Sequence, residues 1–227
     1  MSTQRPSRVQ TVRSVRILLV DDHPVVREGL AEMLRRRPGF SVCGEAEDRA
    51  QALNAVESCK PDLAILDLTL KGEPGIELVK DIHARHPELP VLVLSIHDEL
   101  VHARRVIRAG AAGYINKQEA PAKILAAVER VLDGEIYLSD RVTSQITAQF
   151  AGRLKGQSAH LEGLTDRELQ TLEFIGDGLS TRQIAELLHL DTSTIETYRA
   201  RIKEKLALQD AHELLQYAIR WNRNQGF

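Results

Sequence analysis

The segment ILLVDDHPVVREGL (residues 17–30) joins an apolar run to two aspartates and then to a helical pattern. Short apolar runs recur through the first half of the chain, and most of them lack the alternation of a strand with one solvent-exposed face. These runs are VRILLV (15–20), FSVCGEA (40–46), DLAILDL (62–68), PVLVLS (90–95) and GYINK (113–117). Such runs are typical of strands that are covered on both faces in a parallel sheet.

Helical patterns separate the runs, at residues 24–37, 50–58, 75–86, 98–109 and 120–133. Five strands alternating with five helices predict a doubly wound α/β domain with a five-stranded parallel sheet, over residues 15–135. The patterns near the C-terminus are purely helical, so residues 161–227 are predicted to form a second, smaller all-α domain. A linker with one helix is expected at 136–160, and a disordered arm at 1–14.

Composition excludes several classes of protein. The chain has 227 residues and a net charge of −2, so any binding of nucleic acid must come from a local patch. No apolar run approaches the ~20 residues that span a bilayer, and residues 1–14 lack the apolar stretch of a secretory signal. Cys43 and Cys59 have no metal or redox spacing, which favours two reduced thiols. We therefore expect a cytoplasmic protein that does not bind membranes.

Polar and charged residues lie at the carboxyl ends of four of the five predicted strands. They are Asp21 and Asp22 after the first strand, Asp67 on the third, Ser95 on the fourth and Lys117 on the fifth. In an open parallel sheet, these strand ends meet at one edge. Three crowded carboxylates imply a bound cation, and oxygen ligands with room for water suit Mg²⁺. A carboxylate beside Mg²⁺, an ammonium group and a hydroxyl can attack a phosphoryl donor in line.

Four segments resemble the receiver domains of bacterial two-component response regulators: ILLVDDHPVVREGL (17–30), LDLTLKGEPGIEL (66–78), VLSIHDE (93–99) and AGAAGYINK (109–117). This resemblance implies a flavodoxin-like receiver fold in which Asp67 is the phosphoacceptor. It also implies that Mg²⁺ is bound by Asp22, Asp67 and the backbone carbonyl of Thr69, with Asp21 acting largely through water.

The same resemblance implies roles for three further residues. Lys117 would pair with the phosphoryl group, and Ser95 would donate a hydrogen bond to it. Tyr114 matches the switch aromatic of the family, whose ring enters the space that Ser95 vacates. Phosphorylation would thereby remodel the face formed by residues 98–119.

The all-α segment carries the signals of a helix-turn-helix. Thr165 with Glu168 predicts a capping box, and Ser180 with Gln183 resembles a second one. Asp191 can cap the helix that follows. Two short helices and a polar-faced third helix are typical of this motif. The positions of the third helix, 191–206, that should face inward are Ile195, Tyr198, Ile202 and Leu206.

The N-terminal half of such a third helix reaches base edges in the major groove, while basic side chains contact phosphates. Glu196 could accept a hydrogen bond from cytosine, and the Thr197 methyl could contact thymine. The residues predicted to contact DNA are Ser193, Thr194, Glu196, Thr197, Arg199, Ala200, Arg201, Lys203 and Lys205.

Three segments are similar to DNA-binding domains of the LuxR/FixJ/NarL type: LTDREL (164–169), GLSTRQIAELL (178–188) and STIETYRARIKEKL (193–206). Tyr198 and Arg201 stand where that family usually has His and Asn. The family uses its last helix for dimerisation, which implies that role for Leu214, Leu215 and Ala218.

These features predict a transcriptional response regulator that is not an enzyme, beyond assisting its own phosphorylation and dephosphorylation. A histidine kinase would phosphorylate Asp67, and the protein would then form a homodimer on a two-fold DNA site. Three alternatives stay open: a Mg²⁺-dependent phosphohydrolase, a DNA-binding protein that is not phosphorylated, and a regulator that acts through protein–protein contacts without sequence-specific DNA binding. The Tyr198 and Arg201 departures leave the last of these open.

Overall fold

The computed structural model describes residues 14–71, 73–151, 161 and 163–225. Five parallel strands form the main sheet, in the order β2-β1-β3-β6-β7. They are β1 (Val15–Val20), β2 (Phe40–Ala46), β3 (Leu63–Asp67), β6 (Val91–Ser95) and β7 (Gly113–Asn116). The predicted doubly wound sheet is confirmed, and each strand overlaps the apolar run that predicts it.

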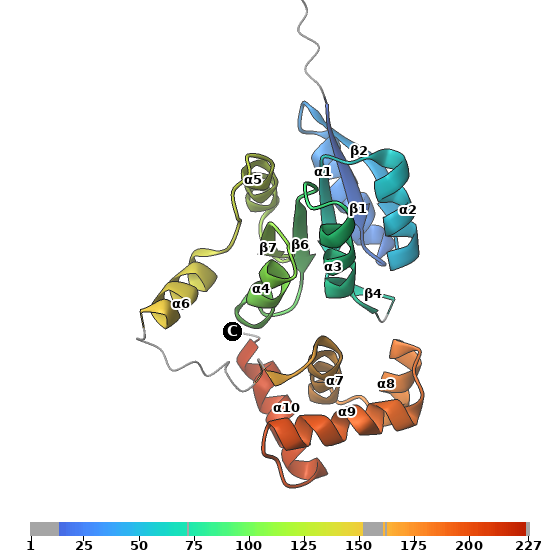
Figure 1. The fold of residues 1–227 in the computed structure, drawn as a ribbon, viewed down its shortest axis with the longest axis vertical. Coiled ribbons are helices and arrows are strands. Elements are labelled where there is room, and N and C mark those ends of the chain that lie inside the picture. Colours follow the sequence, from blue (N-terminus) through green and yellow to red (C-terminus); the bar gives the residue numbers. More distant parts are fainter. Residues whose placement is uncertain (1–13, 72, 152–160, 162, 226–227) are drawn as a thin grey trace, which may run out of the picture.

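Five helices cover the two faces of this sheet (Figure 1). They are α1 (Pro24–Arg35), α2 (Arg49–Cys59), α3 (Gly75–Arg85), α4 (Glu99–Arg108) and α5 (Pro121–Leu132). Helices α2, α3 and α4 pack on the face that contains Leu18, and α1 and α5 pack on the face that contains Ile17. Because both faces are covered, the strands carry apolar residues at successive positions.

The strand order places the first and third strands at the centre of the sheet. From β1 the chain crosses to β2 on one side and later returns to β3 on the other. The carboxyl ends of β1 and β3 therefore flank the crevice where the winding direction reverses, which is where open α/β sheets bind ligands. Asp21 follows β1 directly and Asp67 is the last residue of β3, so both lie at this crevice.

A short antiparallel pair that the sequence patterns do not predict follows Asp67. It consists of β4 (Thr69–Leu70) and β5 (Glu73–Pro74), and two-residue strands are too short to show a periodicity. The start of α3 closes tightly on this loop, because the Gly75 N–H donates to the Leu68 carbonyl over 2.6 Å. A β-carbon at Gly75 would lie 2.2 Å from the Asp67 carbonyl oxygen, so this approach requires glycine.

The linker begins as part of the sheet edge. Tyr137 accepts a hydrogen bond from the Tyr114 N–H over 2.9 Å and donates one to the Ala112 carbonyl over 3.0 Å. The predicted linker helix is confirmed as α6 (Asp140–Phe150), which buries Val142 in the same core as α4. The last part of the predicted linker (152–160) and nearly all of the predicted arm (1–14) lie outside the described residues.

The described residues of the smaller domain form four α-helices: α7 (Asp166–Gly176), α8 (Thr181–Leu188), α9 (Thr192–Lys205) and α10 (Ala211–Gln225). Both predicted capping boxes are present, at Thr165 and Ser180, and each stabilises its helix by about 1 kcal/mol. Asp191 occupies the N-cap position of α9, but its side chain makes no capping hydrogen bond. Asp191 is therefore at the predicted N-cap position, but it does not cap the helix with its side chain as predicted.

The two domains are in contact through α7, which lies next to α4 and the β4–β5 pair (Figure 1). Val101 of α4 packs against the apolar core of the small domain. Among the described residues, no helix combines the length and apolar character needed to cross a membrane.

Candidate functional site

Four of the predicted strand-end residues, Asp21, Asp22, Asp67 and Lys117, lie together in an acidic pocket. The Lys117 ammonium lies 2.6 Å from Oδ2 of Asp21 and 2.7 Å from Oδ2 of Asp67. Both carboxylates are buried. The lysine extends from the end of β7 across the crevice to the ends of β1 and β3, so three strands that are far apart in the sequence supply one charged cluster.

Burial and charge act against each other in this pocket. Burial raises the pKa of Asp67, and the nearby Lys117 only partly offsets the rise. Burial alone would lower the pKa of Lys117, but the carboxylates of Asp67 and Asp21 outweigh it and raise that pKa. Lys117 therefore stays charged, and the ionised Asp67 needs more positive charge than one ammonium group supplies.

The pocket fits a divalent cation. Oδ1 of Asp22 is buried and accepts no hydrogen bond, although Nδ1 of His23 lies 2.8 Å from it. Asp21, Asp22, His23 and Asp67 each offer a ligand atom, and these atoms lie within 4.8 Å of one another. A buried carboxylate oxygen without a hydrogen bond is costly unless it binds a cation. His23 was not predicted as part of this cluster, and the carbonyl of Thr69 stays a prediction.

Ser95 and Tyr114 both hold the backbone of one residue, His97, in the β6–α4 loop. Oγ of Ser95 accepts a hydrogen bond from the His97 N–H over 3.2 Å, and the Tyr114 hydroxyl donates to the His97 carbonyl over 2.7 Å. Both side chains are buried, and burial raises the pKa of Tyr114. The two predicted switch residues are thus connected through His97, which links the pocket to its surroundings.

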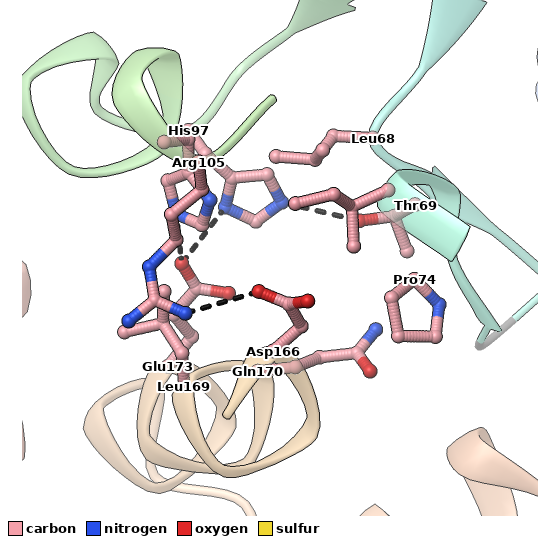
Figure 2. Close-up of a pocket in the computed structure, with 11 residues that line it drawn as sticks. Leu68, Thr69, Pro74, His97, Arg105, Asp166, Leu169, Gln170 and Glu173 are labelled. Carbon is pink, nitrogen blue, oxygen red and sulfur yellow. Dashed lines mark hydrogen bonds and ion pairs between the residues drawn. The ribbon is translucent and has the colours of Figure 1, made fainter. Parts of the chain in front are cut away.

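The side chain of His97 points toward the small domain (Figure 2). Its Nδ1 lies 3.4 Å from Oε1 of Glu173 on α7, and Nε2 of His102 lies 2.7 Å from the same oxygen. Burial alone would raise the pKa of Glu173, but the two histidines outweigh it and lower that pKa to about 2. Glu173 is therefore a buried carboxylate that faces two imidazoles across the domain boundary.

A second polar contact joins the domains beside the first. Arg105 of α4 donates to Oδ1 of Asp166 over 3.0 Å and also to the Leu161 carbonyl. Lys80 of α3 lies 3.2 Å from Oδ2 of the same aspartate. Sequence reasoning missed this contact, because its residues are remote in the chain. For the first contact, one signal in the sequence was Glu173, a charged residue on the buried face of α7.

Helix α9 presents the surface that the sequence predicts. Ser193, Glu196, Thr197, Ala200 and Arg201 are exposed, and Ile195 and Ile202 are fully buried. In Figure 1, α9 lies on the side of the small domain away from the five-stranded sheet. Tyr198 and Leu206 are half-buried and pack against the same core, so the predicted inward positions of this helix are confirmed.

Several predicted DNA-contacting side chains also have partners within the domain. Oε1 of Glu196 accepts a hydrogen bond from Oγ1 of Thr181 over 2.7 Å. Lys205 lies 2.6 Å from the buried carboxylate of Glu168. Arg199 and Lys203 are half-buried. The exposed guanidinium of Arg201 is thus the more accessible cation on this face.

The predicted dimer residues do not form a surface. Leu214 and Ala218 are both 0 % exposed and belong to the core of their own domain. Leu215 is half-buried and packs against that core. A second chain cannot reach Leu214 or Ala218 in this structure, so the predicted dimer contact is wrong for these two residues.

Comparisons with known proteins agree with this architecture. Residues 17–129 match the response regulator receiver domain, and residues 162–218 match the bacterial regulatory proteins of the luxR family. The transcriptional activator protein ExaE of Pseudomonas putida is 38% identical over 203 residues, which cover 89% of this chain and 95% of ExaE. The DNA-binding transcriptional activator DevR/DosR of Mycobacterium tuberculosis is 34% identical, and the alignment covers 93% of this chain and 97% of DevR/DosR.

A solved structure adds a comparison over both domains. RcsB from Salmonella enterica serovar Typhimurium, bound to promoter P1flhDC in the presence of the phosphomimetic BeF3−, is 25% identical to this chain. The TM-score is 0.64, and the match covers 90% of this chain and 98% of RcsB. The chain has an acidic pocket on a receiver fold and, after it in the sequence, a helix-turn-helix whose helices begin with capping boxes. It belongs to the LuxR-type response regulators, the DNA-binding transcription regulators of two-component systems.

Proposed function

We propose that a histidine kinase phosphorylates Asp67 in the cytoplasm, and that this modification controls dimerisation and DNA binding. The observation that carries the proposal is the pairing of Lys117 with both Asp21 and Asp67 beside a buried Asp22 oxygen that has no hydrogen bond. RcsB, which is similar in fold, is described as bound to promoter DNA with a phosphomimetic, which is consistent with this coupling.

The pocket supports attack by Asp67 on a phosphoryl donor. One carboxylate oxygen would form the O–P bond while the P–N bond of a phosphohistidine breaks, and the electron pair would stay on the departing imidazole. Lys117 already lies 2.7 Å from Asp67, so its ammonium can pair with the new phosphoryl oxygens. Asp22, Asp67 and the Thr69 carbonyl would hold Mg²⁺, with Asp21 acting through water. Bound Mg²⁺ neutralises part of the phosphoryl charge.

The hydrogen bonds of His97 offer a route from this pocket to the domain boundary. A phosphoryl group on Asp67 would attract the Ser95 hydroxyl, and Ser95 would then release the His97 N–H. The Tyr114 hydroxyl holds the carbonyl of the same residue, so movement of the tyrosine also shifts this loop. Because the His97 ring faces Glu173 of α7, the shift weakens the contact between the domains.

The proposal is tested by selecting DNA from a pool of random duplexes with Mg²⁺ and beryllofluoride. We expect the treated protein to enrich a two-fold sequence and to bind it as a dimer in sedimentation. The Asp67→Asn variant should give the same result with and without beryllofluoride. Equal selection by the untreated and treated wild-type protein would contradict control by Asp67.

Replacement of Arg201 with alanine is expected to weaken binding of the selected duplex about equally for all sequences. The salt dependence of log K should fall by about one unit of slope, because one phosphate contact is lost. Replacement of Glu196 with alanine should instead change the base preference at one position of the site. The difference in binding free energy between the preferred base and the other bases there should fall by about 1–3 kcal/mol. Fluorescence anisotropy at several salt concentrations measures both effects.

The matched control is Arg85→Ala, which removes an exposed arginine at the end of α3 in the receiver domain. This variant should bind DNA with the wild-type affinity and salt slope. If Arg201→Ala behaves like Arg85→Ala, then α9 does not contact the phosphates through Arg201.

A further inference from the structure

A cluster of nitrogen and oxygen ligands joins the two domains outside the acidic pocket. His97 lies in the β6–α4 loop, His102 on α4 and Glu173 on α7, and their ligand atoms lie within 4.8 Å of one another. The two imidazole rings are 5.1 Å apart between centroids and tilted by 42°, so they are not stacked flat. The ring of His97 turns Nδ1 toward Glu173 (Figure 2), and Nε2 of His102 lies close to the same carboxylate.

The spacing suits a small metal ion. Two ligand atoms that bind one tetrahedral ion at about 2.0–2.1 Å are separated by about 3.4 Å. Nδ1 of His97 lies 3.4 Å from Oε1 of Glu173. Nε2 of His102 lies 2.7 Å from the same oxygen, and this distance would have to lengthen by about 0.7 Å on metal binding.

The environment has the other properties of a metal site. Nε2 of His97, the nitrogen that faces away from Glu173, lies 3.2 Å from Oγ1 of Thr69, and such an outer hydrogen bond orients a ligating histidine. The side chains of His102 and Glu173 are each 9 % exposed. A cavity of about 30 Å³ lies against all three residues, which is room for a metal ion or a water molecule.

The approach to the cluster is open and acidic. A hollow of about 680 Å³ reaches His97 and Glu173 from solvent, so it can supply a metal ion and a water as fourth ligand. Four carboxylates and one arginine line this hollow besides Glu173: Asp98, Glu99, Glu119, Asp177 and Arg141. A surplus of negative charge at the mouth favours the entry of a cation.

We propose that His97, His102 and Glu173 form a Zn²⁺ site that fastens the receiver domain to the DNA-binding domain. Two imidazoles and one carboxylate, with an open fourth position, are a ligand set that suits Zn²⁺. Mg²⁺ prefers oxygen ligands, which separates this site from the pocket around Asp67. Because the ligands come from both domains, Zn²⁺ stabilises the arrangement in which the domains are in contact. The proposal does not depend on phosphorylation of Asp67.

The test uses the untagged full-length protein, freed of metal with a chelator and kept in excess Mg²⁺ to occupy the acidic pocket. Titration with Zn²⁺ against a chromophoric chelator should show one equivalent bound. Co²⁺ in place of Zn²⁺ should give the intense visible absorption of a tetrahedral site. The variants His102→Ala and Glu173→Gln should each lower the Zn²⁺ affinity by at least about 100-fold.

Two matched variants locate the ion. His212→Ala removes an exposed histidine on α10, and His23→Ala removes the histidine of the acidic pocket; both should keep the wild-type affinity. If His102→Ala and Glu173→Gln fail to fold, His97→Ala replaces them, because the His97 side chain is 23 % exposed. This variant should also lower the Zn²⁺ affinity. The proposal is overturned if the wild-type protein binds no stoichiometric Zn²⁺. It is also overturned if Zn²⁺ is lost in His23→Ala and kept in His102→Ala, because the ion then lies in the acidic pocket.

Discussion

Replacing Asp67 with asparagine is expected to lower phosphorylation by acetyl phosphate by at least about 100-fold, to the background level. The amide oxygen is a far weaker nucleophile than the carboxylate, and the variant also loses a proposed Mg²⁺ ligand. Incorporation of the phosphoryl group can be measured by the shift of the protein on phosphate-affinity gels. Removal of Mg²⁺ with EDTA should have the same effect on the wild-type protein.

The same substitution should stabilise the receiver domain in the absence of Mg²⁺. Burial raises the pKa of Asp67 in the folded chain above its value in the unfolded chain. The unfolded chain therefore loses this proton at a lower pH than the folded chain, and the free energy of unfolding falls as pH rises through the two pKa values. Asparagine does not ionise, and Asp67→Asn should therefore be more stable than wild type at neutral pH. The control is Asp133→Asn, at an exposed aspartate after α5, which should be phosphorylated normally. Wild-type phosphorylation of Asp67→Asn would assign the phosphoacceptor to another residue.

Replacing Leu214 with alanine is expected to destabilise the DNA-binding domain by about 2–5 kcal/mol. The leucine is fully buried among residues such as Leu172 and Ile202, and its loss leaves a cavity that helices α7, α9 and α10 can fill only in part. The single tryptophan of the chain, Trp221, packs against this core. Its fluorescence during urea unfolding therefore reports the stability of this domain.

The matched control is Leu187→Ala, at a leucine of α8 that is 48 % exposed. This variant should lower the free energy of unfolding by less than about 1 kcal/mol, since it removes less apolar surface from the interior than Leu214→Ala does. An unchanged stability of Leu214→Ala with a loss of dimers on DNA would restore the prediction that Leu214 belongs to a dimer contact. In that case Leu214→Ala would unfold at the wild-type urea concentration but would no longer form dimers on DNA.

The acidic pocket was predictable because it depends on positions along single strands. Asp21, Asp67 and Lys117 each end an apolar run, and parallel strands bring such ends to one edge. The small domain was also predictable in outline, since capping boxes are local signals. His23 was not predicted, because nothing in its immediate sequence distinguishes a pocket histidine from a residue that begins a turn before α1.

The last helix shows where pattern reasoning fails. Leu214, Leu215 and Ala218 have helical spacing, which identifies an apolar face and says nothing of what covers it. The structure covers Leu214 and Ala218 with helices of the same domain. A resemblance that assigns dimerisation to this helix therefore does not identify which of its side chains face a partner.

The two domains, the order of their elements and the charged residues of the pocket could be predicted from the amino-acid sequence, because periodicity, capping and strand ends are properties of short segments. The contacts of Ser95 and Tyr114 with the His97 backbone, and of His97 and His102 with Glu173, became visible in the folded chain alone. Glu173 is separated from His102 by 71 positions, and their contact depends on how two independently patterned domains pack against each other. No local pattern in the chain records that packing.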